Sequence, residues 1–149
     1  MALPDWIVEH IKLYQSDPEK AHLMDCSGFG GKPATPTLLL TTTGRKSGRP
    51  IPTPLIYGTQ GPAYVVIGSK GGAPDHPDWY KNLVADPVCR IQVSRKAYRA
   101  RARTAAGAER TRLWAQMVDI YPPYDPYQQS AKDREIPVIV LEPFESLTS

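Results

Sequence analysis

A run of β-favouring residues that leads directly into a glycine-bracketed basic turn constrains this chain most. The run spans residues 37–43, the turn reads GRKSG at 44–48, and a second extended run follows at 51–57. Leucine, threonine and tyrosine suit a pleated surface, and glycines supply the backbone angles that a tight turn requires. The pattern predicts a strand, a tight turn and an antiparallel return strand.

The turn between these strands has the composition of a phosphate site. It carries three cations, Arg45, Lys46 and Arg49, beside the hydroxyl of Ser47 and several exposed backbone amides. Successive amides and charged donors of this kind can surround an anion. Many hairpin turns are basic only because they face water, so the residues alone leave both interpretations open.

Further strands and helices are expected on both sides of this hairpin. The strands cover residues 63–68, 88–93, 97–104 and 136–141, and the helices cover 5–14, 75–86 and 108–121. Short connections favour antiparallel neighbours. The predicted class is α+β, mainly β, with about six mostly antiparallel strands in a closed or nearly closed barrel and helices outside it. A length of 149 residues fits one domain, with a helical lead-in at 1–21 and the barrel at 22–149.

Prolines shape two of these segments. Pro52 and Pro54 lie two apart in the strand 51–57, and proline cannot donate to a sheet ladder, so one edge of this strand should be unpaired and open to a flat ligand. Residues 121–127 place three tyrosines among three prolines. We expect no regular helix there, but an irregular aromatic segment that caps a pocket. Residues 16–36 are polar and glycine-rich and should form a connecting loop without a site.

A second glycine-rich turn at 67–74 contains Ser69 and Lys70 and precedes the helix expected at 75–86. A turn of this kind before a helix N-terminus favours anions. It is neither the GxGxxG dinucleotide fingerprint nor the GxxxxGK[ST] phosphate loop, and neither motif occurs elsewhere in the chain.

Composition excludes several classes of function. The net charge of +3 is too small for a nucleic-acid-binding face. Cys26 and Cys89 are too few and too far apart for a disulfide framework or a metal knuckle, which favours the reducing cytoplasm. No run approaches the roughly 20 apolar residues of a membrane span, and no secretory signal begins the chain. The helix at 5–14 is expected to cover one end of the barrel; the alternative is a lid or a weak contact with the inner face of the membrane.

The usual catalytic groups are missing. His10, His22 and His76 are scattered, none neighbours a convincing nucleophile, and no spacing suggests a metal site. Phosphate-friendly turns beside aromatic residues fit an enzyme whose cofactor performs the chemistry, and a pure binding protein fits equally well.

Five segments of the chain form a specific combination of motifs. They are LLLTTTGRKSG at 38–48, GSKGGA at 68–73, HPDWYKNL at 76–83, YPPY at 121–124 and REIPV at 134–138. Through these segments the chain resembles the deazaflavin-dependent nitroreductase family, in order and spacing, over roughly residues 22–143.

The resemblance implies a split β-barrel that binds coenzyme F420, an 8-hydroxy-5-deazaflavin with a phosphodiester and an oligoglutamate tail. Arg45, Lys46 and Ser47 would hold the phosphate and the start of the tail. The remaining implied cofactor residues are Ile51, Pro52, Thr53, Pro54, Leu55, Ile56, Ile67, Gly68, Ser69, Lys70, Asp78, Trp79, Tyr80, Lys81, Asn82 and Tyr124.

The resemblance also implies the reaction. The reduced cofactor would deliver a hydride to a quinone or a nitroaromatic acceptor, as in a quinone reductase or nitroreductase. Hydroxyls of Ser69, Tyr121, Tyr124 and Tyr127 would orient the acceptor and steady the charge that develops on it. Two alternatives remain: an FMN-dependent oxidoreductase on the same barrel, and a protein that carries a cofactor or lipid without turnover.

Overall fold

The computed structural model describes residues 4–148. The helices are α1 (Asp5–Ser16), α2 (Pro18–Ala21), α3 (Asp78–Ala85), α4 (Gly107–Ile120) and α5 (Tyr124–Ala131), with short 3-10 turns η1 (Ser27–Phe29) and η2 (Lys70–Gly72). The strands are β1 (Leu23–Met24), β2 (Thr35–Thr43), β3 (Pro50–Ile56), β4 (Gly58–Gln60), β5 (Ala63–Ile67), β6 (Val88–Val93), β7 (Lys96–Thr104) and β8 (Val138–Ser146).

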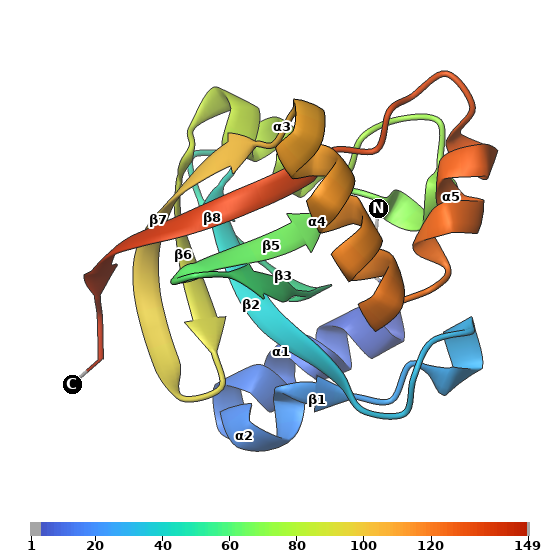
Figure 1. Cartoon of the computed structure of the whole chain (residues 1–149). Helices are drawn as coiled ribbons and strands as arrows, with labels where there is room; N and C mark the ends of the chain where they lie inside the picture. The colour runs from blue at the N-terminus through green and yellow to red at the C-terminus, as the bar shows by residue number, and fades with distance from the viewer. Residues whose placement is uncertain (1–3, 149) are drawn as a thin grey trace.

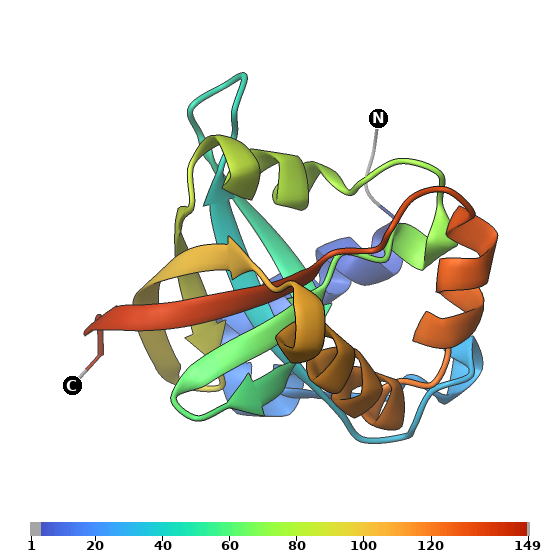
Figure 2. The ribbon, with the colours of Figure 1, turned by 45° about the horizontal axis from the view of Figure 1, so that its top comes forward.

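The strands form one antiparallel sheet that curls into a half-barrel (Figure 1). Its order is β1-β2-β6-β7-β8-β5-β4, and β3 pairs with β2 outside this path. The predicted split-barrel class and antiparallel strands are therefore confirmed. The hairpin of β2 and β3 forms as expected, with Thr43 opposite Pro50 and Thr37 opposite Ile56. Its turn projects beyond the sheet beside α3 (Figure 2).

Strand β5 and the first half of its neighbour β8 are buried on both faces. Val138 and Val140 join one core with Leu113 and Met117 of α4, whereas Ile139 and Leu141 join a second core on the opposite face. Successive side chains of a strand point to opposite faces, so a strand covered on both sides must be apolar throughout. This requirement explains the unbroken apolar run at 138–141.

Buried polar contacts hold α1 against β2 at one end of the sheet. The Tyr14 hydroxyl donates to the carbonyl of Thr37 at 2.6 Å, and Nε2 of His10 lies 3.0 Å from Thr37 Oγ1. Both side chains are almost fully buried, and such groups require partners of this kind. Helix α1 therefore covers the end of the barrel, as expected. Among residues 4–148, no helix is both long and apolar enough to cross a membrane.

One local prediction was wrong because of where a proline falls. Residues 124–131 form the regular helix α5 and not an irregular segment. Pro126 is the third residue of this helix, where the amide has no intrahelical partner and proline costs no hydrogen bond. The loop expected at 16–36 also contains α2, β1 and η1.

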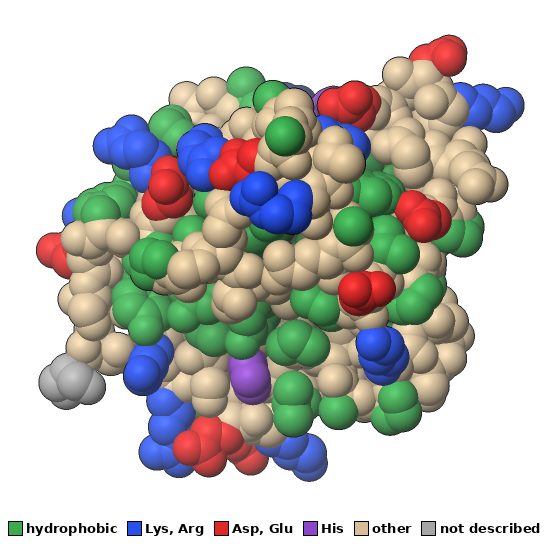
Figure 3. All heavy atoms as spheres, viewed as in Figure 1, with side chains coloured by type: hydrophobic (Ala, Val, Ile, Leu, Met, Phe, Trp, Pro, Cys, Tyr) green, Lys and Arg blue, Asp and Glu red, His purple; other side chains and the backbone are tan. Residues whose placement is uncertain are grey.

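Pairing and burial depart from expectation at two further places. The strands β3 and β5 are not hydrogen-bonded neighbours, because β5 pairs with β4 and β8. On α3, Trp79 and Leu83 are buried as apolar residues of a packed helix face should be, but the apolar residue Val84 is 68% exposed. Figure 3 shows hydrophobic side chains gathered in a band across one face, with charged side chains interspersed around it.

Candidate active site

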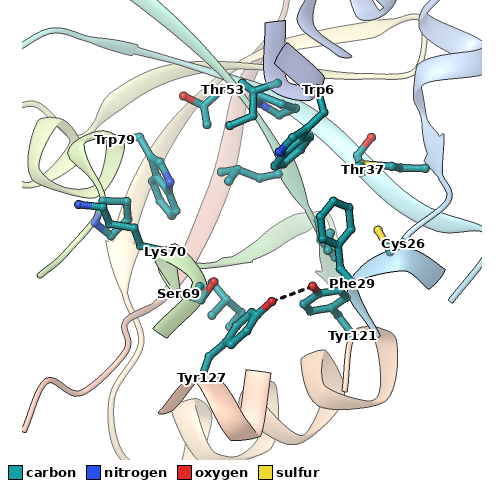
Figure 4. A pocket seen from close by; sticks show the side chains of 18 of the residues that line it. Trp6, Cys26, Phe29, Thr37, Thr53, Ser69, Lys70, Trp79, Tyr121 and Tyr127 are labelled. Atoms are coloured by element: carbon teal, nitrogen blue, oxygen red, sulfur yellow. Dashed lines mark hydrogen bonds between the residues drawn. The ribbon is translucent and has the colours of Figure 1, made fainter. Parts of the chain in front are cut away.

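A cavity of about 580 Å³ opens between β3, the loop after β5, α3 and the tyrosines around α5 (Figure 4). Many of the residues implied by the family resemblance line it. They are Ile51, Pro52, Thr53, Pro54, Leu55, Ile56, Ile67, Ser69, Lys70, Asp78, Trp79, Asn82, Tyr121, Tyr124 and Tyr127. The fold thus brings predicted site residues from four separate segments of the chain together around one cavity.

Strand β3 forms one wall of the cavity and exposes an edge without donors. Its prolines lie opposite Thr43, Thr41 and Leu39 of β2, every second position of the register. A proline can occupy only the non-hydrogen-bonded pairs of an antiparallel ladder, whose backbone groups point away from the partner strand. The outer edge therefore offers carbonyl acceptors and no amide donors at Pro50, Pro52 and Pro54. The expected unpaired edge is confirmed.

A basic turn adjoins the cavity through the lining residues Asp78 and Asn82 of α3. Arg45 donates through its guanidinium to Asn82 Oδ1 at 2.8 Å and forms a 3.2 Å ion pair with Asp78. Asn82 is buried and also donates to Thr42 Oγ1 at 3.2 Å. These contacts fix the turn after β2 against α3. Lys46 and Ser47 are exposed in the same turn, and like Arg45 they lie outside the cavity lining.

The loop after β5 carries Ser69 and Lys70 into the cavity. Lys70 has a left-handed backbone with φ of 47°, a conformation that residues other than glycine rarely adopt. Its ammonium group forms a 3.0 Å ion pair with Asp75, and this contact lowers the pKa of the Asp75 carboxyl. Lys70 therefore presents a partly neutralised cation on the same loop as the Ser69 hydroxyl.

Three tyrosines line the opposite end. The hydroxyls of Tyr121 and Tyr127 lie 3.0 Å apart, and Figure 4 shows them beside Ser69. Tyr124 is 4% exposed, and its hydroxyl makes no hydrogen bond within the described part of the chain. Burial raises the pKa of both Tyr121 and Tyr124 well above its usual value. Both hydroxyls therefore stay protonated and can donate hydrogen bonds, but they are not available as bases.

Some of the implied residues lie away from the cavity lining. Gly68 packs against Pro137, where an added Cβ would come within 2.8 Å of that ring. The Tyr80 hydroxyl lies 3.0 Å from Thr104 Oγ1 and faces a separate depression of about 290 Å³. Lys81 follows Tyr80 on α3 and does not line the cavity.

The lining also contains residues that sequence reasoning missed. They are Trp6, Ile7, Met24, Cys26, Phe29, Thr37, Gly71 and Pro77. Trp6 and Phe29 are each about half exposed, and their rings pack with centroids 5.6 Å apart. The sequence signal that could have revealed this part of the lining was Phe29, an aromatic residue within the polar segment 16–36. Only the folded chain brings that segment to the cavity beside α1.

The half-barrel and its cavity of about 580 Å³ define this chain as a split-barrel protein with a site of cofactor size. A sequence model of the family described as F420H(2)-dependent quinone reductase matches residues 20–143. The chain belongs to the F420H(2)-dependent quinone reductase family, whose cofactor is coenzyme F420. The resemblance to deazaflavin-dependent reductases is therefore confirmed.

Individual relatives agree with this family. In Mycobacterium tuberculosis (strain ATCC 25618 / H37Rv), the protein Rv3178 is 40% identical over 116 residues, covering 78% of this chain and 97% of the relative. The F420H(2)-dependent quinone reductase Rv1261c of the same strain is 39% identical over 110 residues, covering 72% of this chain and 74% of the relative. A solved structure of the F420-H2 dependent reductase FDR-A is 41% identical, with a TM-score of 0.66, and the match covers 71% of this chain and 93% of that chain.

Proposed function

We propose that this chain binds coenzyme F420 in the cavity and reduces a quinone-class acceptor there. The observation that carries the proposal is the order of chemical groups along the site. Cations of the 44–49 turn adjoin the lining residues Asp78 and Asn82, the edge of β3 forms a wall, and tyrosine hydroxyls line another part of the cavity. This order matches a ligand with a ring system and an anionic tail, next to a second molecule that needs hydrogen-bond donors.

The donor set supports the fit of this cofactor. Its anionic tail suits the Gly44–Arg49 turn, where Lys46 and Arg49 are exposed and Arg45 is already oriented by Asp78 and Asn82. Its ring suits the apolar wall of β3, whose carbonyl edge accepts hydrogen bonds from ring N–H groups. A cavity of about 580 Å³ lies within the range of pre-formed small-molecule sites.

In this proposal, separate residues bind the cofactor, orient the acceptor and stabilise its developing charge. When bound and reduced, the deazaflavin supplies a hydride. Arg45, Lys46 and Ser47 would hold its phosphate, and Ser69 would orient the acceptor above the ring. Tyr124 would donate to the acceptor oxygen, where negative charge grows as the hydride arrives. Because its pKa is raised, this tyrosine would stabilise the charge through a hydrogen bond, while solvent supplies the proton that completes the reduction.

Several finer assignments accompany this proposal. A quinone is the proposed acceptor, and nitroaromatic compounds are proposed as further substrates. The division into a lead-in at 1–21 and a cofactor-binding barrel at 22–149 is also proposed, although Trp6 and Ile7 line the same cavity. The two buried free thiols support a cytoplasmic location. A membrane-surface contact would use the exposed rings of Trp6 and Phe29.

A parallel fluorescence titration of the purified protein with F420 and with FMN tests the proposal. We expect tight binding of F420 and little binding of FMN. Oxidation of reduced F420 is then followed with menadione and with a nitroimidazole as acceptors. A preference for FMN would contradict the cofactor assignment. Tight F420 binding without turnover of any acceptor would instead indicate a carrier protein.

A further inference from the structure

One guanidinium group connects several segments around the cavity. Arg134 lies between α5 and β8, and its Nε donates to the carbonyl of Ala73 at 2.9 Å. Its two terminal nitrogens donate to the carbonyls of Gly68 at 2.9 Å and Ser69 at 2.7 Å, and one of them lies 3.1 Å from Nδ1 of His76. A planar fork can reach four acceptors in this way, whereas the single ammonium group of lysine cannot.

The loop that Arg134 holds has an unfavourable backbone. Lys70, Gly71 and Gly72 are consecutive left-handed residues, with φ of 47°, 62° and 83°. Two bonds close the loop internally, from the Gly72 amide to the Ser69 carbonyl at 2.9 Å and from the Ala73 amide to the Lys70 carbonyl at 3.1 Å. Glycine adopts such angles without strain, so the strain lies in the backbone of Lys70, and strain of this kind persists only where the surroundings determine the conformation further.

Arg134 is itself fixed by the tyrosine-bearing helix. Its amide donates to the carbonyl of Ala131 at 3.2 Å, and Nε2 of Gln128 donates to its carbonyl at 2.8 Å. Helix α5 also carries Tyr124 and Tyr127. The guanidinium therefore joins the loop that presents Ser69 and Lys70 to the helix that presents the tyrosines.

We propose that Arg134 is a positioning residue that sets the Ser69–Lys70 loop against the tyrosine helix. The proposal rests on the proposed function, because it gives that loop the part of placing the acceptor against the cofactor ring. Arg134 acts through the backbone of the loop and lies outside the cavity lining. Its loss should disturb the distance between the acceptor and the cofactor ring more than it disturbs the basic end of the site.

Replacing Arg134 with lysine tests this role, with Arg99→Lys as the control. Arg99 is exposed on β7 and is paired with Glu145 far from the loop. In the cofactor-free protein, hydrogen exchange of residues 68–76 should become faster in R134K and stay unchanged in R99K. With F420 and menadione, kcat of R134K should fall about tenfold to a hundredfold, since small misplacements of reacting groups are costly. The dissociation constant for F420 should stay near the wild-type value.

A double-variant cycle with Ser69→Ala separates positioning from general destabilisation. If Arg134 acts through Ser69, R134K should slow the S69A enzyme far less than it slows the wild type. The proposal would be overturned if the kcat losses of R134K and S69A multiply in the double variant. It would also be overturned if hydrogen exchange of residues 68–76 is unchanged in R134K. Should R134K fail to fold, the pair His76→Asn and His76→Leu replaces it. Asparagine keeps an acceptor for Arg134 and should retain kcat, whereas leucine should lower it; equal activity in the two would overturn the proposal.

These measurements also separate this inference from the proposed function. A wild-type protein that neither binds nor oxidises reduced F420 would contradict the proposed function, and with it the catalytic part of this inference. Wild-type turnover with an equally active R134K enzyme would contradict the role of Arg134 alone.

Discussion

Single residues determine the polarity of the cavity at each end. The prolines of β3 remove donors from one wall, and Asn82 and Asp78 orient the guanidinium of Arg45 at the basic end. At the other end, burial keeps the Tyr124 hydroxyl protonated and without a partner within the described residues. A protonated hydroxyl without a partner is available to donate to a ligand. The tyrosines and the basic turn should therefore affect different steps, acceptor reduction and cofactor binding.

Replacing Tyr124 with phenylalanine should affect catalysis more than cofactor binding. The substitution removes only the hydroxyl and leaves the buried ring in place. We expect kcat with menadione to fall about tenfold to a hundredfold, as for the loss of a hydrogen bond made in the transition state. Tyr98→Phe, on β7 in the opposite core, is the control. Equal losses in kcat and F420 affinity would make Tyr124 a cofactor residue only.

Replacing Lys46 with alanine should weaken F420 binding by about 1–3 kcal/mol, because one charge-assisted contact is lost. Fluorescence titration measures the change. Lys96→Ala is the matched control, since Lys96 is equally exposed next to the β6–β7 turn. An unchanged dissociation constant in K46A would remove the GRKSG turn from the site. The effect should shrink as salt is added, because the contact is exposed.

At the scale of elements, η2 packs closely against α5. This packing brings the loop with Ser69 and Lys70 next to the helix with Tyr124 and Tyr127. A Cβ built on Gly72 would come within 2.8 Å of the Tyr127 carbonyl and 3.0 Å of Ser130 Cβ. Backbone cannot yield as a flexible side chain can, so this position requires glycine for space as well as for its φ of 83°. The packing holds the Ser69–Lys70 loop against the helix that carries Tyr124 and Tyr127.

Gly72→Ala should therefore destabilise the protein more than Gly61→Ala does. Gly61 has a similar φ of 58°, but an added Cβ there meets nothing within 4 Å. Both substitutions should cost about 1–2 kcal/mol for the left-handed backbone, and G72A about 1–3 kcal/mol more for crowding. Urea unfolding measures both. Equal losses would show that η2 can move away from α5 without cost.

At the scale of the whole molecule, the sheet separates two cores, and two histidines, His10 buried and His76 half-buried, connect outer segments of the fold. His10 joins α1 to β2, and His76 joins the segment before α3 to Arg134. Burial lowers the pKa of both imidazoles from 6.5, and for His76 the charges of Arg134 and Lys81 lower it further while Asp75 opposes them. Both side chains are therefore neutral in the folded protein at neutral pH.

The free energy of unfolding should therefore fall as the solution is acidified below about pH 6.5. The unfolded chain binds protons at these histidines in that range and the folded chain does not, so stability rises with pH until the ordinary histidine pKa is passed. Thermal or urea unfolding between pH 5 and about 8 measures the slope. The double variant His10→Gln with His76→Asn should flatten it. A slope that the substitutions leave unchanged would assign it to carboxylates instead.

Local pattern alone determined the strands β2, β3 and β5 to β8, the β2–β3 hairpin and the unpaired edge of β3, because alternation and proline positions act within a few residues, whereas the short strands β1 and β4 were not predicted. The same was true of the basic turn and of the Ser69–Lys70 loop, whose glycines and cations are contiguous in the chain. The tertiary structure alone decided that α5 is a helix beside η2, that Trp6 and Phe29 line the cavity, and that Arg134 holds a loop more than 60 residues away. These features depend on contacts between segments distant in sequence, and their geometry arises only when the sheet closes and both cores are filled.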